Sequence, residues 1–183
     1  MGLIIIIMRL FLAIDLPDKV KKSLSGQLFD LKKKYPDFFW VDENNYHITL
    51  LFLGEMTNVK KIKDKVKAAI YDKFHFYLYS YKMDLFMKSK ITVYLGFRRE
   101  KKIEELVKVV RETLGFYNEK KYIPHLTLAR CRIPSKQQYF VLKKILSKQS
   151  LDIEFPVKKM CLYESISTGK EPIYKKISSF PLL

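Results

Sequence analysis

The chain has 183 residues, with 35 Lys and Arg against 19 Asp and Glu, which gives a formal net charge of +16. This length suits one domain, and a hydrophobic content of 48% excludes a disordered chain. Six Gly and seven Pro exclude collagen-like and low-complexity proteins. Two Cys are too few for a disulfide scaffold, so we expect a cytoplasmic protein.

The positive charge is spread over the whole chain. Residues 1–90 carry 16 basic and 10 acidic side chains, and residues 91–183 carry 19 and 9. A detachable basic tail is therefore excluded. The charge suits a polyanionic partner such as RNA, and it equally suits a solvated surface that keeps the protein in solution.

Residues 3–14 are nearly all apolar, but Arg9 interrupts them and Asp15 ends them. The stretch is shorter than the roughly 20 apolar residues that cross a membrane, and it has no signal-peptide pattern. We predict a buried strand and no membrane association. Met8 is an alternative start, which would make residues 1–7 an N-terminal extension. The strand would place Arg9, Phe11 and Ala13 on one face and Leu10, Leu12 and Ile14 on the other.

Helices and strands alternate after this segment. Apolar residues at spacings of three and four predict helices at about 18–34, 57–71, 99–115 and 135–148. The last helix begins with a capping box formed by Ser135 and Gln138. Strands are predicted at about 47–53, 74–86 (broken near Lys82), 91–97, 122–132, 151–163 and 172–179. The short connection between the second and third of these favours antiparallel pairing.

The order strand, helix, strand, helix, strand occurs twice, at about 8–86 and about 91–163. No Pro- or Gly-rich linker separates the two halves, so we predict a single bilobal domain over residues 1–183. A duplicated unit of this kind suggests a pseudo-two-fold axis, with a closing strand at about 172–179.

Two of the three His lie in nearly identical segments, Tyr46-His47-Ile48-Thr49-Leu50 and Pro124-His125-Leu126-Thr127-Leu128. Residues i and i+2 of a strand share a face, so each segment presents an imidazole beside a hydroxyl. A two-fold axis would let the two pairs face each other across a groove. His75 has no such Thr, and we expect it to be a core residue.

Two imidazoles with ordinary pKa values near 6.5 can hold opposite protonation states at neutral pH. One can accept a proton from an attacking water while the other donates to a leaving oxygen, and two Thr hydroxyls can hold phosphate oxygens. The pattern predicts phosphodiester chemistry. No cofactor is expected, and the His and Cys residues show no metal-ligand spacing.

The paired motifs resemble those of the 2H phosphoesterase superfamily. More closely, the chain resembles the RNA 2′,3′-cyclic phosphodiesterases, long called 2′-5′ RNA ligases. The resemblance runs from Met8 through both motifs to the C-terminal strands, in the segments 9–14, 40, 45–55, 124–130, 162–165 and 172–174. It implies an α+β fold with two pseudo-symmetric lobes, each an antiparallel sheet flanked by helices, and an active-site groove between them.

The resemblance also implies a reaction: metal-independent hydrolysis of 2′,3′-cyclic phosphate RNA ends to 2′-phosphates. Some members join or cleave 2′-5′ linkages in tRNA halves. The partner would be RNA, and the protein is expected to be a monomer. His47 would donate a proton to the departing 3′ oxygen, His125 would accept one from water, and Thr49 and Thr127 would bind the phosphate.

By the same resemblance, Phe52 and Arg130 would sandwich the terminal base. Each lies five residues after its histidine and would face the other way in a regular strand. A bend or bulge after Leu50, and a similar one before Arg130, is therefore required. Phe11 would be either the floor of the groove or a core residue.

Two other functions compete with this one. A binding module could hold RNA or a nucleotide without turnover, although a binder has no need of two proton-transfer groups. A hydrolase of the same superfamily could instead act on a small cyclic phosphate, such as ADP-ribose cyclic phosphate.

Overall fold

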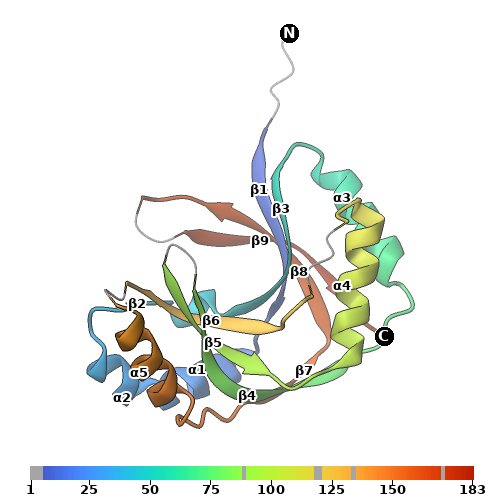
Figure 1. The fold of residues 1–183 in the computed structure, drawn as a ribbon. Helices are drawn as coiled ribbons and strands as arrows, with labels where there is room; N and C mark the ends of the chain where they lie inside the picture. Colours follow the sequence, from blue (N-terminus) through green and yellow to red (C-terminus); the bar gives the residue numbers. More distant parts are fainter. Residues whose placement is uncertain (1–5, 88–89, 118–120, 133–134, 170–171) are drawn as a thin grey trace.

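The computed structural model describes residues 6–87, 90–117, 121–132, 135–169 and 172–183. Within them, nine antiparallel strands form a curled sheet in the order β7-β4-β5-β6-β3-β1-β8-β9, with β2 paired to β6 (Figure 1). The strands are β1 (Met8–Asp15), β2 (Phe39–Trp40), β3 (His47–Met56), β4 (Phe76–Met87), β5 (Ile91–Phe97), β6 (His125–Cys131), β7 (Glu154–Val157), β8 (Lys159–Ile166) and β9 (Ile173–Pro181). The expected α+β fold is confirmed.

The helices lie close to the predicted ranges, with one interruption. They are α1 (Asp18–Gln27), α2 (Phe29–Lys34), α3 (Val59–Ile70), α4 (Lys101–Leu114) and α5 (Lys136–Leu146), with a 3₁₀ turn η1 (Glu43–Asn45). The single helix expected at 18–34 is two helices that meet at Leu28, just after the weak helix formers Ser25 and Gly26. Ser135 is the N-cap of α5 as predicted, because its hydroxyl accepts a hydrogen bond from the backbone N–H of Gln138.

Strand β1 has the two faces that its sequence predicts. Leu10, Leu12 and Ile14 belong to the main core. Phe11 and Ala13 lie on the opposite face, in a small separate cluster with Cys161 and Tyr163. Residues 3–5 of the predicted strand lie outside the described part of the chain.

The two repeats meet at the centre of the sheet, where β3 lies beside β6. Beyond this centre the halves exchange strands. Strand β4 from the first half pairs with β5, and β8 from the second half pairs with β1. The repeat halves therefore do not correspond one to one to the two sides of the sheet.

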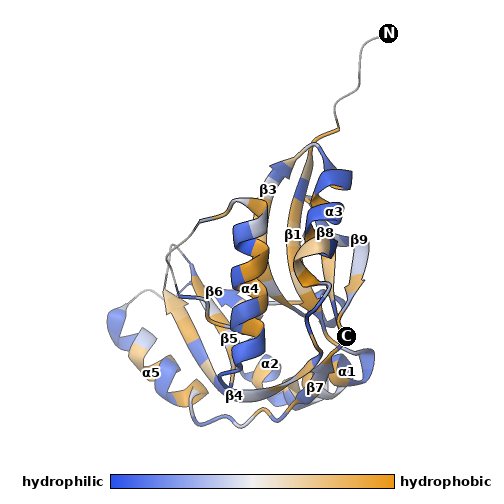
Figure 2. Ribbon diagram, turned by 90° about the vertical axis from the view of Figure 1, so that its right-hand side faces the viewer, coloured by the Kyte–Doolittle hydropathy of each residue, from blue (hydrophilic) through white to orange (hydrophobic). Residues whose placement is uncertain are grey.

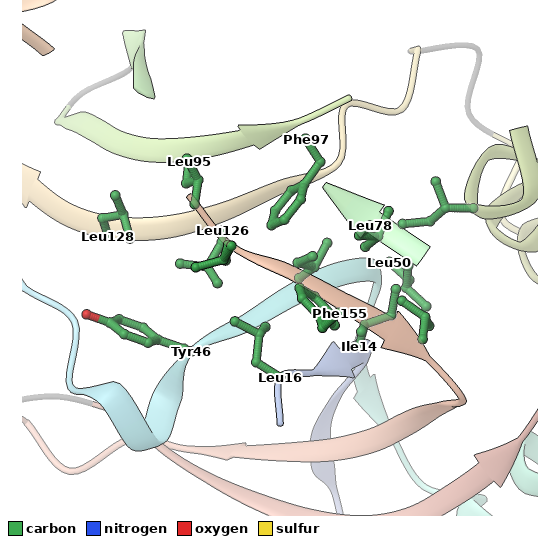
Figure 3. Packing of buried hydrophobic residues seen from close by; sticks show 14 of the residues in the cluster. Ile14, Leu16, Tyr46, Leu50, Leu78, Leu95, Phe97, Leu126, Leu128 and Phe155 are labelled. Carbon is green, nitrogen blue, oxygen red and sulfur yellow. The ribbon is translucent and has the colours of Figure 1, made fainter. Parts of the chain in front are cut away.

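One large apolar core lies between the sheet and the helices, and it draws on both halves. Figure 3 shows Phe97 of β5 close to Phe155 of β7, with Ile14 of β1 and Leu50 of β3 nearby. Figure 2 shows that α4 is divided lengthwise into a hydrophilic and a hydrophobic face, as its amphipathic sequence predicts. None of the described helices is long and apolar enough to span a membrane.

His75 is not the core residue that we expected. It is exposed, and both its backbone N–H and its Nδ1 lie within hydrogen-bond distance of the Leu183 carbonyl, at 2.7 and 2.9 Å.

Gly115 ends α4 and turns the chain back toward β6. Its φ is 80°, and the N–H of Phe116 donates to the carbonyl of Arg111 at 2.8 Å. Gly115→Ala should lower the free energy of unfolding by about 1 kcal/mol, since an L-residue is strained at this φ. Gly26→Ala is the matched control: a Cβ there meets nothing within 4 Å, and a helical Ala should raise stability by about 0.5 kcal/mol. Urea unfolding measures both, and a shift in the same direction for the two variants would contradict this account.

Candidate active site

The two His-x-Thr motifs lie side by side across the centre of the sheet. Ile48 of β3 pairs with Leu126 of β6 in antiparallel register, and both side chains are fully buried. In this register the histidine of each motif lies opposite the threonine of the other motif. All four side chains are on the face away from the core. The structure thus brings together the four residues that the sequence predicts: His47, Thr49, His125 and Thr127, all partly buried.

Both imidazoles are oriented in the same way. The Nδ1 atom of His47 lies 2.7 Å from the carbonyl of Asn45, and the Nδ1 of His125 lies 2.7 Å from the carbonyl of Ile123. A carbonyl oxygen only accepts, so each Nδ1 donates, and the lone pair of each neutral ring lies on Nε2. Each histidine therefore presents Nε2 as its proton-exchanging atom.

Aromatic rings surround each histidine. His47 lies 5.1 Å from Phe11 and 5.0 Å from Tyr174, measured between ring centroids. His125 lies 4.9 Å from Phe86 and 5.5 Å from Tyr94. These rings restrict how the imidazoles can turn. Phe11 is buried beside His47.

A bulge occurs in each motif strand, and the one after Leu50 was expected. Along β3, Ala13 pairs with Thr49 while Leu12 pairs with Leu51, so the ladder skips Leu50. This shift pairs Phe52 with Phe11 and leaves Phe52 69% exposed.

The ladder between β5 and β6 skips Leu128 in the same way. Val93 pairs with Ala129, whereas Tyr94 pairs with Thr127. Phe52 and Arg130 each lie five residues after their histidine, an odd spacing that would turn them to the other face. The extra residue in each bulge returns them to the face of the histidine.

The bulges bring Phe52 and Arg130 to a common cavity of about 490 Å³. Phe11 and Tyr174, which both contact His47, also line it, together with Arg9 and the segment 165–169. This volume falls within the range of small-molecule sites. The cavity therefore adjoins His47, and it has an aromatic ring and a guanidinium to offer a ligand.

Three aromatic residues of the site were not assigned a role from the sequence: Tyr174, Tyr94 and Phe86. Tyr174 lies in a segment that carries the resemblance, but nothing in the local pattern indicates that it reaches His47. Tyr94 could have been found only from its pairing with Thr127, which the sequence does not specify.

An ionic network lies next to His47. Asp15, which pairs with His47 in register, accepts from Lys21 at 2.8 Å and from Lys176 at 2.7 Å. Lys21 is only 9% exposed. Burial opposes ionisation of Asp15, but hydrogen bonds from Lys176 and Lys21 outweigh it and lower the pKa of this carboxyl.

Burial lowers the pKa of His47 from its ordinary value of 6.5. The hydrogen bond to the Asn45 carbonyl and the charge of Asp15 act in the opposite direction, while the positive charges of His125 and Lys21 add to the lowering. His47 is therefore neutral at pH 7 in the unliganded site.

Within the described ranges, no group of three or more His, Cys, Asp or Glu side chains could hold a metal ion.

Comparison with solved structures identifies the fold. E. coli LigT complexed with 3′-AMP aligns with a TM-score of 0.75 and 22% identity, over 97% of this chain and 99% of that chain. TT0787 of Thermus thermophilus aligns with a TM-score of 0.73 and 23% identity, over 96% and 98%. The curled sheet with two His-x-Thr motifs across its centre thus has the same fold as LigT.

Sequence comparison identifies the family. The model of the 2′-5′ RNA ligase superfamily matches residues 22–168. The RNA 2′,3′-cyclic phosphodiesterase of Thermotoga maritima is 31% identical over 92% of each chain. The protein of the same name from Methanocaldococcus jannaschii is 30% identical over 94% of this chain and 100% of its own. This chain belongs to the 2′-5′ RNA ligase superfamily.

The network around Asp15 generates a stability prediction. Asp15→Asn should lower the free energy of unfolding by about 3 kcal/mol, because it leaves the buried charge of Lys21 without its carboxylate. Lys176→Met is the matched control; its side chain is 41% exposed, so the loss should stay below about 1 kcal/mol. Because the pKa of Asp15 is lowered in the folded state, the difference between Asp15→Asn and wild type should shrink as pH falls below about 4. Equal losses in the two variants, measured by urea unfolding, would contradict the assignment.

Proposed function

We propose that this protein hydrolyses the 2′,3′-cyclic phosphate ends of RNA to 2′-phosphates, without a metal ion. The observation that carries the proposal is the antiparallel pairing of the two motifs, which sets two imidazoles and two hydroxyls on one face. Curated relatives at 31% and 30% identity bear the name RNA 2′,3′-cyclic phosphodiesterase, which supports the same reaction.

The two histidines divide the proton transfers. Nε2 of His125 accepts a proton from water as the water oxygen attacks phosphorus. Nε2 of His47 donates a proton to the departing 3′ oxygen, which leaves the phosphate on the 2′ oxygen. The hydroxyls of Thr49 and Thr127 hold non-bridging oxygens, where negative charge increases in the transition state.

The cavity beside His47 holds the terminal nucleoside. Phe52 and Arg130 take the base between them, and the Arg130 guanidinium adds positive charge near the phosphate. Phe11 forms the floor. This arrangement favours a nucleotide end over a phosphate alone.

Substrate binding prepares His47 for its role as proton donor. In the unliganded site burial lowers its pKa, so the ring is mostly neutral at pH 7. An anionic cyclic phosphate beside the imidazole favours its charged form and raises this pKa. His47 therefore becomes protonated as the substrate binds.

The proposal extends to the setting of the reaction. We place the protein in the cytoplasm as a monomer, with tRNA fragments among its substrates. Because the cleavage of a 2′-5′ linkage passes through the same cyclic phosphate, the same groups would also support reversible 2′-5′ ligation.

Replacing either histidine tests the reaction. His47→Ala and His125→Ala should each reduce hydrolysis of an oligonucleotide 2′,3′-cyclic phosphate by about 10²–10⁴-fold, because each removes one proton transfer. His75→Ala, which alters an exposed histidine outside the site, is the control and should retain activity. Chromatography should identify a 2′-phosphate product, and EDTA should leave the rate unchanged. Full activity in either motif variant would refute the proposal, and tight binding without product would favour a binding module.

The pH profile tests the two roles. A proton donor is lost as pH rises through its pKa, so kcat/KM should decline on the alkaline side with a midpoint below 6.5, the ordinary value from which burial lowers the pKa of His47. The corresponding midpoint in kcat should lie at higher pH, since bound phosphate raises the same pKa. The alkaline decline should be absent from the residual activity of His47→Ala and present in that of His125→Ala. The opposite result would exchange the two roles.

A further inference from the structure

A second cavity, of about 500 Å³, lies against α4 and the segment that leads into β6. Cations and aromatic rings line it, among them Lys108, Arg111, Lys121, Phe116, Tyr117 and Tyr122. It shares no lining residue with the cavity that holds Phe52 and Arg130. Neither the motifs nor the proposed reaction uses it.

The charge of this cavity is positive. Arg99 is paired with Glu104, with N–O distances of 3.1 and 3.2 Å, and Lys108 lies 4.0 Å from Glu112. Arg111 and Lys121 also line the cavity. Its described lining therefore holds four Arg or Lys side chains against two Glu.

Its rings offer a surface for a base. Tyr117 is 86% exposed, and Tyr122 lies with its ring centroid 5.8 Å from the Arg111 guanidinium. Aromatic rings beside Arg and Lys are the usual composition of surfaces that bind single-stranded RNA, because bases stack on the rings while cations follow the backbone.

One residue of the cavity lining contacts the backbone of the strand that carries Thr49. The hydroxyl of Tyr122 donates to the backbone carbonyl of Thr49 at 3.0 Å. Tyr122 also lies three residues before His125, and three residues of chain span at most about 11 Å. A stacked strand advances about 3.4 Å per nucleotide, so a few nucleotides cover this distance.

We propose that this cavity is a second RNA subsite, which binds a nucleotide a few positions upstream of the cyclic phosphate end. The base stacks on Tyr117, and a backbone phosphate lies near Arg111 and Lys121. The inference rests on the proposed function, since it assumes that the substrate at the catalytic groove is RNA. It also assigns part of the net charge of +16, at Arg111 and Lys121, to binding of the RNA backbone.

Two substrates that differ only in length test the subsite. The double variant Tyr117→Ser/Lys121→Gln alters exposed side chains and should fold normally, which thermal unfolding checks. Its KM for an oligonucleotide 2′,3′-cyclic phosphate should rise about tenfold, from the loss of one stacking contact and one phosphate contact. Its kcat/KM for a mononucleoside 2′,3′-cyclic phosphate should change by less than about twofold. In a plot of the logarithm of the oligonucleotide binding constant against the logarithm of salt concentration, the slope should become less steep by about 0.7.

A matched variant separates the subsite from general charge. Tyr81→Ser/Lys82→Gln removes a different exposed tyrosine and a lysine beside it on β4, where the lysine lies 5.6 Å from the ring centroid. It should leave both substrates unaffected. Equal weakening of the oligonucleotide by the two double variants, equal effects on both substrates, or no effect at all would overturn the subsite.

A binding measurement distinguishes failure of the subsite from failure of the proposed reaction. If the wild type hydrolyses neither substrate, the proposed reaction fails. Fluorescence anisotropy with an oligonucleotide that ends in a 3′-phosphate then still decides the subsite. Unchanged affinity in Tyr117→Ser/Lys121→Gln would reject it, and a loss of about tenfold would retain it.

Discussion

The pairing of Ile48 with Leu126 is the contact on which the site depends. Both side chains are buried in the core, and strand geometry then turns the flanking histidines and threonines to the opposite face. The same packing that stabilises the centre of the sheet therefore determines the spacing of the two histidines and the two threonines. The geometry of the candidate site is a consequence of core geometry.

The surroundings of His47 show how stability and reactivity are balanced. Burial against Phe11 and Tyr174 holds the ring in place but disfavours its charged form. The carboxylate of Asp15 acts in the opposite direction, and Lys21 and Lys176 keep that carboxylate ionised. The carboxylate therefore offsets part of the effect of burial on the pKa of His47.

Much of the fold and the centre of the site followed from the sequence, because both depend on local periodicity. The two faces of β1 and the His-x-Thr pairs follow from side chains that alternate every second residue. The helices follow from apolar residues spaced three or four apart. Even the bulge after Leu50 could be inferred, since Phe52 stands an odd number of residues from His47. What could not be predicted depends on pairing between distant segments: Tyr174 against His47, and Lys176 against Asp15, 161 residues away. The prediction that His75 is a core residue was wrong for the same reason, because its partner Leu183 is distant in the sequence.

The exchange of outer strands has a consequence for how such a protein could arise. Strand β4 completes the sheet around β5 and β6, and β8 completes the sheet around β1, so each half supplies an edge that the other lacks. One half alone would expose an unpaired strand edge, and a second identical copy could cover it by swapping the same strand. The duplicated chain therefore has the topology of a strand-swapped dimer whose two subunits have been joined. Such joining gives each histidine its own surroundings, which two identical subunits could not do.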